Sequence, residues 1–147
     1  MQEKTLLLVE DNPDDEALTI RALNKHNLSN RIIVARDGQE ALDYLFGEGD
    51  YAGRDITQLP QVILLDLKLP KVDGLQVLER LRSEALTQYV PVVVLTSSNE
   101  ESDMVRSYDL GANSYVRKPV DFEQFIEAAR QLGLYWLVLN GIPYGKE

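Results

Sequence analysis

Apolar residues in this chain fall into short unbroken runs, separated by stretches of mixed polarity. Four of these runs are strongly apolar, and a fifth is weaker by pattern. Short continuous apolar runs are typical of strands that are buried on both faces of a parallel sheet. The pattern therefore predicts strands at residues 5–9, 31–35, 62–65, 91–95 and 113–117.

Between the strands, apolar residues recur every three or four positions, which is the spacing of one helix face. Asn12 is a good N-cap for the first helix and Pro13 a good first helical residue. This helix should end near residue 27, and the others are expected between residues 38 and 47, from about 74 to 83, between 99 and 111, and from about 121 onward. Five strand–helix repeats predict an α/β fold, a doubly wound five-stranded parallel sheet with five helices, as in flavodoxin-like proteins.

Length and charge narrow the function classes. The 147 residues suffice for one domain with a sizeable core. A net charge of −9 disfavours nucleic acid and anionic membranes as partners, and it suits metal cations or basic protein surfaces. The chain has no cysteine, no apolar run long enough to span a membrane and no visible signal peptide. We therefore expect a cytoplasmic protein without disulfides or thiolate metal sites.

Polar groups of a restricted kind follow four of the five predicted strands. Glu10 and Asp11 follow the first strand, and Asp66 follows the third. Thr96 ends the fourth strand, and Lys118 follows the fifth. Because the carboxyl ends of parallel strands point the same way, these groups should share one pocket. Three close carboxylates need a cation such as Mg²⁺, and a lysine and a hydroxyl beside an aspartate suit phosphoryl transfer through an aspartyl-phosphate.

In this order, and over nearly the whole chain, these residues resemble the receiver domain of two-component response regulators, the CheY-like fold. The motifs that carry the resemblance are Glu10-Asp11, Asp66 followed by Leu69-Pro70 and Asp73-Gly74, Thr96-Ser97, and Lys118-Pro119. The resemblance implies one receiver domain over residues 1–147 that accepts a phosphoryl group on Asp66 from a sensor histidine kinase. It also implies a phosphoacceptor that assists its own phosphorylation and dephosphorylation, not an enzyme with a separate substrate.

The resemblance further implies a magnesium site. Asp11 and Asp66 would ligate Mg²⁺ together with the backbone carbonyl of Lys68, and Glu10 would be a supporting acid. The acidic pair is Glu-Asp here, whereas the family commonly has Asp-Asp. Both pairs supply two carboxylates, so this departure leaves the implied metal site intact.

Three further roles are implied for the phosphorylated state. Thr96 and Lys118 would hold the phosphoryl oxygens, and Tyr115 would be the aromatic switch residue that turns inward when Thr96 is drawn to the phosphate. Without the resemblance, Tyr115 is better explained as core or edge filling, since strands favour tyrosine. Lys68 lies two residues after Asp66 and Ser98 two after Thr96. In this family such positions resemble tuners of phosphoryl lifetime.

More narrowly, the chain resembles the small stand-alone regulators that pair with bacterial and cyanobacterial phytochrome histidine kinases. This resemblance is carried by the run Glu-Asp-Asn-Pro-Asp-Asp at residues 10–15, the long loop before the third strand, the run Asp-Leu-Lys-Leu-Pro at residues 66–70 and the tail at residues 135–140. It implies a phytochrome-type kinase as partner. A regulator without an output domain would signal by protein contact or by onward phosphotransfer.

Several polar residues are expected to have no direct role. His26 is the only histidine and lies near a helix end, while the donor histidine of such systems belongs to the kinase. Asp14, Asp15 and Glu16 are expected to be a solvated helix start, because negative charge suits that end of the helix dipole. Asp73 is expected to be a loop or cap residue.

The last predicted helix continues into a tail that is apolar on every side, and residues 134–147 are expected to extend this helix. Such a helix must bury more than one face, so it packs further over its own domain or meets a partner. We favour a homodimer through the last helix and tail. The residues expected at this contact are Phe122, Phe125, Trp136 and Leu137.

Three other functions compete with a regulator. A phosphatase of the haloacid dehalogenase type also uses an aspartyl nucleophile and Mg²⁺, but it needs a second acid where this chain has Lys68. A flavin- or nucleotide-binding module needs a phosphate loop rich in Gly, Ser and Thr after the first strand, where this chain is acidic. A receiver-shaped scaffold that is never phosphorylated is disfavoured because every required group is present.

Overall fold

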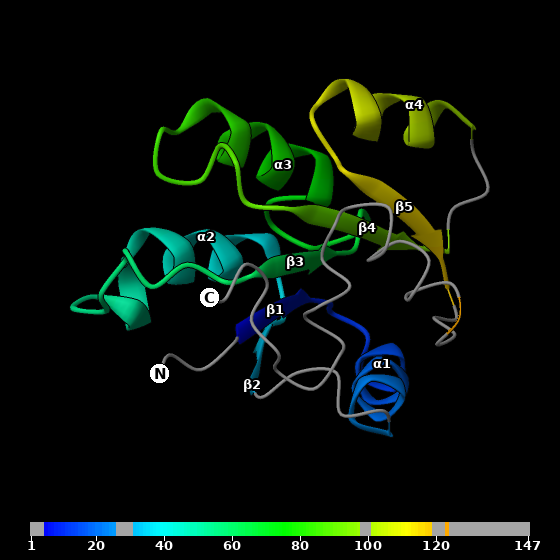
Figure 1. The fold of residues 1–147 in the computed structure, drawn as a ribbon, viewed down its shortest axis with the longest axis horizontal. Helices are drawn as coiled ribbons and strands as arrows, with labels where there is room; N and C mark the ends of the chain where they lie inside the picture. The colour runs from blue at the N-terminus through cyan, green and yellow to red at the C-terminus, as the bar shows by residue number, and fades with distance from the viewer. Residues whose placement is uncertain (1–4, 26–30, 98–100, 119–122, 124–147) are drawn as a thin grey trace, which may run out of the picture.

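The computed structural model describes residues 5–25, 31–97, 101–118 and 123. Within these residues, five parallel strands form one sheet in the order β2-β1-β3-β4-β5 (Figure 1). The strands are β1 (Thr5–Val9), β2 (Arg31–Ala35), β3 (Val62–Leu65), β4 (Val92–Thr96) and β5 (Ser114–Arg117). All five predicted strands are confirmed, and β4 and β5 begin one residue later than predicted.

Helices cover both faces of this sheet in the described part of the chain. They are α1 (Pro13–Lys25), α2 (Gly38–Phe46), the short 3-10 helix η1 (Gly49–Tyr51), α3 (Gly74–Ser83) and α4 (Glu101–Asp109). Figure 1 shows α1 on one face and α2, α3 and α4 on the other. The doubly wound α/β architecture is confirmed, whereas the last predicted helix falls outside the described residues. None of the described helices is long and apolar enough to cross a membrane.

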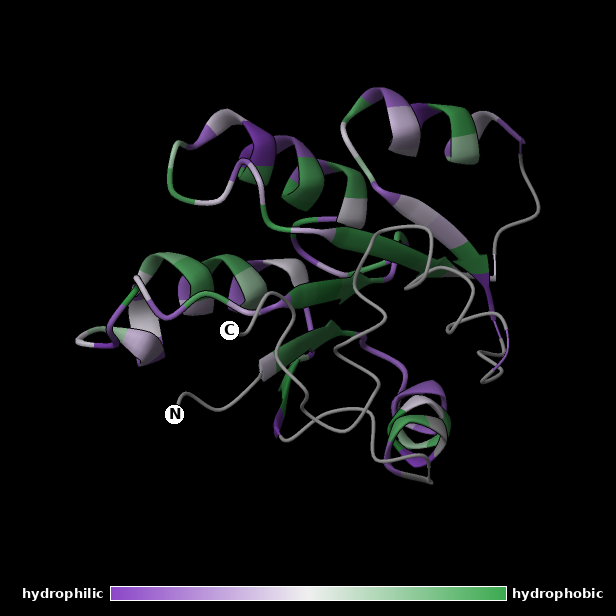
Figure 2. Ribbon diagram, viewed as in Figure 1, coloured by the Kyte–Doolittle hydropathy of each residue, from purple (hydrophilic) through white to green (hydrophobic). Residues whose placement is uncertain are grey.

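Burial on both faces explains the unbroken apolar runs of the central strands. Every residue of β3 is at most 2% exposed, and so are the last four residues of β1. Figure 2 shows these strands as hydrophobic ribbons, whereas the helices carry both hydrophobic and hydrophilic residues. Each fully buried Leu or Val contributes roughly 1.5–3 kcal/mol. The helices α2 and α3 contribute the following residues to the core: Ala41, Leu45, Val77, Leu78 and Leu81.

The loop from β3 to α3 folds back tightly against the end of β3. A Cβ atom at Gly74 would lie 2.3 Å from the carbonyl oxygen of Asp66 and 2.6 Å from Cα of Leu67, so only glycine fits without a backbone shift. Asp73 caps α3 by accepting a hydrogen bond from the amide of Gln76 at 2.9 Å, within a capping box. The cap role predicted for Asp73 is confirmed, and the loop fixes the position at which β3 ends.

Arg82, in the last turn of α3, stabilises the edge of the sheet at which β4 and β5 begin. Its guanidinium donates hydrogen bonds of 2.8–3.3 Å to the carbonyl oxygens of Thr87, Gln88 and Val90, and of 2.9–3.0 Å to that of Gly111. These bonds tie the α3–β4 loop to the turn after α4. The amino-terminal ends of β4 and β5 are therefore held by structural contacts, while the groups with candidate chemistry follow the strands at the other edge.

Candidate functional site

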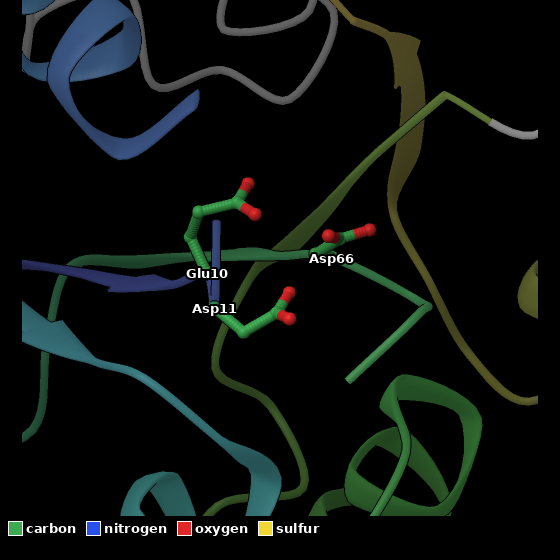
Figure 3. A group of neighbouring side chains, drawn as sticks. All are labelled: Glu10, Asp11 and Asp66. Carbon is green, nitrogen blue, oxygen red and sulfur yellow. The ribbon is translucent and has the colours of Figure 1, made fainter. Parts of the chain in front are cut away.

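Three carboxylates gather at the carboxyl-terminal edge of the two central strands. Glu10 and Asp11 follow β1, Asp66 follows β3, and these strands are neighbours in the sheet. One carboxylate oxygen from each residue lies within 4.8 Å of the other two (Figure 3). Glu10 is fully buried and Asp66 is 4% exposed, whereas Asp11 is open to solvent. The structure thus brings together the three acids for which the sequence predicted a shared pocket.

Lys118, directly after β5, places its ammonium group among these acids. Its Nζ atom lies 2.7 Å from Oε1 of Glu10, 2.9 Å from Oδ2 of Asp15 and 3.0 Å from Oδ2 of Asp66. The contacts with Asp15 and Asp66 are hydrogen bonds, while the contact with Glu10 is an ion pair without hydrogen-bond geometry at Oε1. The lysine side chain is only 8% exposed. Because the lysine is shielded from solvent, these charge-assisted contacts hold its ammonium group firmly in place.

Asp15 is the member of this site that the sequence did not reveal. The prediction of a solvated helix start is wrong for Asp15, because its carboxylate binds Lys118 and its side chain is only 32% exposed. It is also wrong for Glu16, which forms a two-pronged pair with Arg36 at 2.9 and 3.2 Å. It holds for Asp14, which is exposed. Successive acids in the first turn of α1 therefore point to different partners.

Asn12 sets the geometry of that turn. Its Oδ1 atom accepts hydrogen bonds from the amides of Asp14 at 2.9 Å and Asp15 at 3.1 Å, as an N-cap does. Its carbonyl oxygen accepts from the amide of Glu16 at 2.9 Å. Its own amide donates to Oε2 of Glu10 at 3.2 Å. One residue thus joins the start of α1 to the buried acid of the pocket.

Asp66 is held on several sides. Its amide donates to the carbonyl of Val9 at 3.1 Å, and its Oδ1 atom accepts from the amide of Lys68 at 3.3 Å. Its Oδ2 atom faces Lys118. The side chain of Lys68 turns outward and lies 3.8 Å from Asp103 at the start of α4. The backbone of Lys68 is therefore adjacent to the acceptor carboxylate, and its carbonyl remains a predicted metal ligand.

A cavity of about 400 Å³ opens beside the exposed acid of the pocket. Its walls come from the end of β1, the β3–α3 loop and the start of α4. This cavity leaves room for a ligand next to the carboxylates, and nothing in the sequence indicates it. Its lining residues are Asp11, Leu67, Lys68, Leu69, Pro70, Asp73, Leu75 and Asp103.

The pocket carries more negative than positive charge. Loss of hydration, helped by the nearby Asp66 carboxylate and opposed by Lys118, raises the pKa of Glu10 to about 7. Burial alone would lower the pKa of Lys118, but Glu10, Asp15 and Asp66 together raise it, so the ammonium keeps its proton. Three carboxylates contact this one ammonium group, and a fourth, Asp11, shares the pocket with Glu10 and Asp66. Close like charges of this kind favour the entry of a further cation.

The donor set fits a hard divalent cation. Glu10, Asp11 and Asp66 offer carboxylate oxygens only, which is the chemistry that Mg²⁺ prefers. One of the three acids is exposed, so an ion has a path from solvent. The divalent-cation site predicted from the strand ends is thus supported by the geometry of the described residues.

The remaining predicted site residues are described only in part. Thr96 is the last residue of β4 and pairs in register with Arg117, and its side chain lies outside what the structure describes. Tyr115 in β5 is half-buried and packs against the hydrophobic core. The predicted interface residues lie outside the described part of the chain: Phe122, Phe125, Trp136 and Leu137. The roles predicted for these six residues stay predictions.

Comparison with protein families decides what this arrangement is. The family model of the response regulator receiver domain matches residues 6–130. This chain belongs to that family. The match spans the ends of β1, β3 and β5, and therefore includes Glu10, Asp66 and Lys118. The receiver resemblance seen in the sequence is confirmed.

Two relatives match this receiver over most of their length. The chain is 42% identical over 139 residues to the probable methanogenesis regulatory protein FilR2 of Methanothrix harundinacea, and the match covers 94% of this chain and 86% of that protein. It is 34% identical over 140 residues to the response regulator Rcp1 of Synechocystis, with 95% and 93% covered. Both relatives therefore consist largely of the part that is shared with this receiver.

Solved structures share the same fold. The bacteriophytochrome response regulator RtBRR is 56% identical, with a TM-score of 0.85 and 98% of this chain and 86% of that chain covered. The phosphorylated cyanobacterial phytochrome response regulator RcpA is 36% identical, with a TM-score of 0.76 and 99% and 100% covered. The Mn²⁺-bound form of Rcp1 is 34% identical, with a TM-score of 0.76 and 95% and 99% covered. The CheY-like fold is confirmed by all three.

The raised pKa of Glu10 makes cation binding depend on pH. Below pH 7 the metal-free receiver carries a proton on Glu10, and a cation that uses this carboxylate must displace it. We therefore expect the affinity for Mg²⁺ to rise between pH 6 and pH 8, with a proton released on binding. Isothermal titration calorimetry in buffers of different ionisation enthalpy measures both quantities. Glu10→Gln is the control and should abolish the proton release; equal affinities of the unsubstituted receiver at pH 6 and 8 would contradict the prediction.

Proposed function

We propose that this receiver accepts a phosphoryl group on Asp66 from a sensor histidine kinase. The observation that carries the proposal is the buried Asp66 carboxylate, 3.0 Å from the Lys118 ammonium and in one pocket with Glu10 and Asp11. An acceptor oxygen, a fixed positive charge and cation ligands then lie together, which is what phosphoryl transfer requires. The receiver family of this chain supports the same function. The protein is then a phosphoacceptor that assists its own phosphorylation and dephosphorylation.

The proposed transfer assigns a role to each group. A carboxylate oxygen of Asp66 attacks the phosphorus of a phosphohistidine on the kinase; a P–O bond forms, the P–N bond breaks, and the imidazole keeps the electron pair. Lys118 offsets the charge on the phosphoryl oxygens. Asp11, Asp66 and the carbonyl of Lys68 would hold Mg²⁺, with Glu10 as supporting acid. When bound, that ion neutralises charge on the carboxylates and the phosphoryl group.

We propose that the conformational change that follows phosphorylation involves Thr96 and Tyr115. Thr96 ends β4 beside the pocket strand β3, and Tyr115 lies in the neighbouring strand β5. A phosphoryl group that draws the Thr96 hydroxyl inward would favour an inward position of Tyr115. Phosphorylation would then shift an existing balance between two conformations of this side of the sheet.

Substitution of Asp66 tests the acceptor. Incubation with acetyl phosphate and Mg²⁺ should add the mass of one phosphoryl group to the protein, because the Asp66 carboxylate lies beside the Lys118 ammonium and two further acids that could hold the cation. Asp66→Asn should abolish this gain, which intact-mass spectrometry measures. Asp73→Asn is the matched control: Asp73 is exposed in the same loop, and asparagine also caps a helix well.

The control should be phosphorylated at a rate within about twofold of the unsubstituted protein, because asparagine keeps the size and the capping hydrogen bond of Asp73 and no transition-state contact is assigned to this side chain. A phosphoryl gain that survives Asp66→Asn would place the acceptor elsewhere. No gain in any of the three proteins, in the presence of Mg²⁺, would contradict the phosphoacceptor function itself.

The partner is proposed to be a phytochrome-type histidine kinase. Support comes from the 56% identity with RtBRR and from the resemblance at residues 10–15 and in the tail. We expect faster phosphotransfer from an autophosphorylated phytochrome kinase than from histidine kinases with other sensors. Radiolabel transfer at equal kinase concentration measures this preference. Equal transfer from all kinases would contradict the assignment and leave the receiver function intact.

We further propose that residues 1–147 act as one receiver unit, in the cytoplasm, with residues 134–147 extending the last helix. The family match over residues 6–130 and the coverage of most of Rcp1 support this unit. Its signal would pass by protein contact, since a net charge of −9 disfavours nucleic acid and anionic membranes.

The apolar tail supports a homodimer through the last helix, with Phe122, Phe125, Trp136 and Leu137 in the contact. We expect the full chain to run as a dimer in size-exclusion chromatography with light scattering. A chain that ends at residue 134 should be monomeric, because it lacks Trp136 and Leu137. A full-length chain that stays monomeric at high concentration, with and without acetyl phosphate, would overturn the dimer.

A further inference from the structure

Lys118 has a carboxylate partner that the receiver motifs do not account for. Asp15, in the first turn of α1, lies 2.9 Å from Nζ, while Glu10 and Asp66 follow strands of the sheet. We propose that Asp15 is a positioning residue for the Lys118 ammonium, and that it speeds phosphorylation of Asp66 by keeping this ammonium beside the acceptor. The inference rests on the proposed function of Asp66 and adds a residue from a helix to the site.

Asp15 is held rigidly enough for this task. Its amide donates to Oδ1 of Asn12, which caps the helix, and Pro13 fixes the backbone between them. The next residue, Glu16, binds Arg36 through both carboxylate oxygens, which ties the same turn to the segment after β2. The Asp15 carboxylate is therefore carried by a turn that is anchored on two sides.

Asp15 also differs in function from the other two partners. Glu10 and Asp66 belong to the group of acids that could hold a cation, and Asp15 lies outside that group. A cation or a phosphoryl group that engages Glu10 and Asp66 would weaken their hold on the lysine. The ammonium has three donors, so it can keep one hydrogen bond to Asp15 and direct another to a phosphoryl oxygen. Asp15 is then the partner that remains available throughout the reaction.

Asp14 provides a matched control for charge. It lies beside Asp15 in the same helix turn and has the same side chain. It is exposed, however, and its carboxylate has no contact among the described residues. Asp14→Asn and Asp15→Asn each remove one negative charge from the first turn of α1. Both therefore lose a similar interaction with the helix dipole. A difference between the two variants reports the contact with Lys118 rather than net charge or helix stability.

The test compares phosphorylation by acetyl phosphate at saturating Mg²⁺, followed by intact-mass spectrometry. We expect Asp15→Asn to slow phosphorylation about three- to tenfold, as expected for the loss of part of a charged hydrogen bond in the transition state. Asp14→Asn should stay within about twofold of the unsubstituted protein. The dissociation constant for Mg²⁺ should be similar in the two variants, because Asp15 is not a ligand in the proposed site. Equal rates for the two variants would overturn the proposal.

A double-substitution cycle with Lys118→Ala tests the route of the effect. If Asp15 acts through the lysine, Asp15→Asn should have no further effect in the Lys118→Ala background. Effects that add independently in this cycle would also overturn the proposal.

Asp15→Glu keeps the charge but moves the carboxylate by one methylene, and it should react at an intermediate rate. It serves as the test variant should Asp15→Asn fail to fold. A rate equal to that of Asp14→Asn would then contradict positioning.

The two proposals fail in different ways. If the unsubstituted protein gains no phosphoryl group, or gains one that survives Asp66→Asn, the function proposed for Asp66 is wrong. If Asp66 is phosphorylated normally and Asp15→Asn matches Asp14→Asn, the function stands and only the positioning role of Asp15 is lost.

Discussion

The site depends on one ammonium group that contacts three carboxylates. Lys118 enters from the end of β5, and its partners Glu10, Asp15 and Asp66 come from the end of β1, the first turn of α1 and the end of β3. These residues are far apart in the sequence, and only the strand order β2-β1-β3-β4-β5 brings them together. Attraction between charges strengthens as water is excluded, and both Glu10 and Lys118 are shielded. The sheet therefore creates the pocket, and the lysine in turn holds the ends of β1 and β3 and the first turn of α1 in one arrangement.

Most of the sheet and most of the pocket could be predicted from the sequence because two simple rules apply to them. A strand buried on both faces has to be apolar throughout, so the runs at β1, β3 and β4 identify central strands of a parallel sheet. Ligand-binding groups of such sheets follow the carboxyl ends of the strands. Glu10, Asp66 and Lys118 each come directly after a strand, so strand direction places all three at the same end of the sheet, and the strand order brings them within reach of one another. The capping role of Asp73 also follows from local chemistry, since aspartate before a helix start accepts the first free amides.

Asp15 could not be predicted in the same way. Acidic residues are common in the first helical turn because the helix dipole favours them, and this explanation serves Asp14, Asp15 and Glu16 equally well. Which of them meets Lys118 depends on the rotation of α1 about its axis, which is set by Asn12 and by the pair between Glu16 and Arg36. The close approach of Gly74 to Asp66 and the hold of Arg82 on two loops are likewise tertiary features. Contacts that depend on how one element is rotated or seated against another have no periodic signal in the sequence.

The charge balance also limits how the pocket can respond to a divalent cation. Such an ion at Glu10, Asp11 and Asp66 would share two of its ligands with Lys118, because Glu10 and Asp66 contact the ammonium. Lys118 and such an ion would repel each other. Phosphorylation replaces the single negative charge of the Asp66 carboxylate with about two on the phosphoryl oxygens, so it adds about one negative charge between them. Asp15 would meanwhile keep the ammonium from moving away. The phosphoryl oxygens would then offer a partner to both the ion and the ammonium, and the resulting difference in electrostatic free energy is what a phosphorylation-dependent change in conformation would draw on.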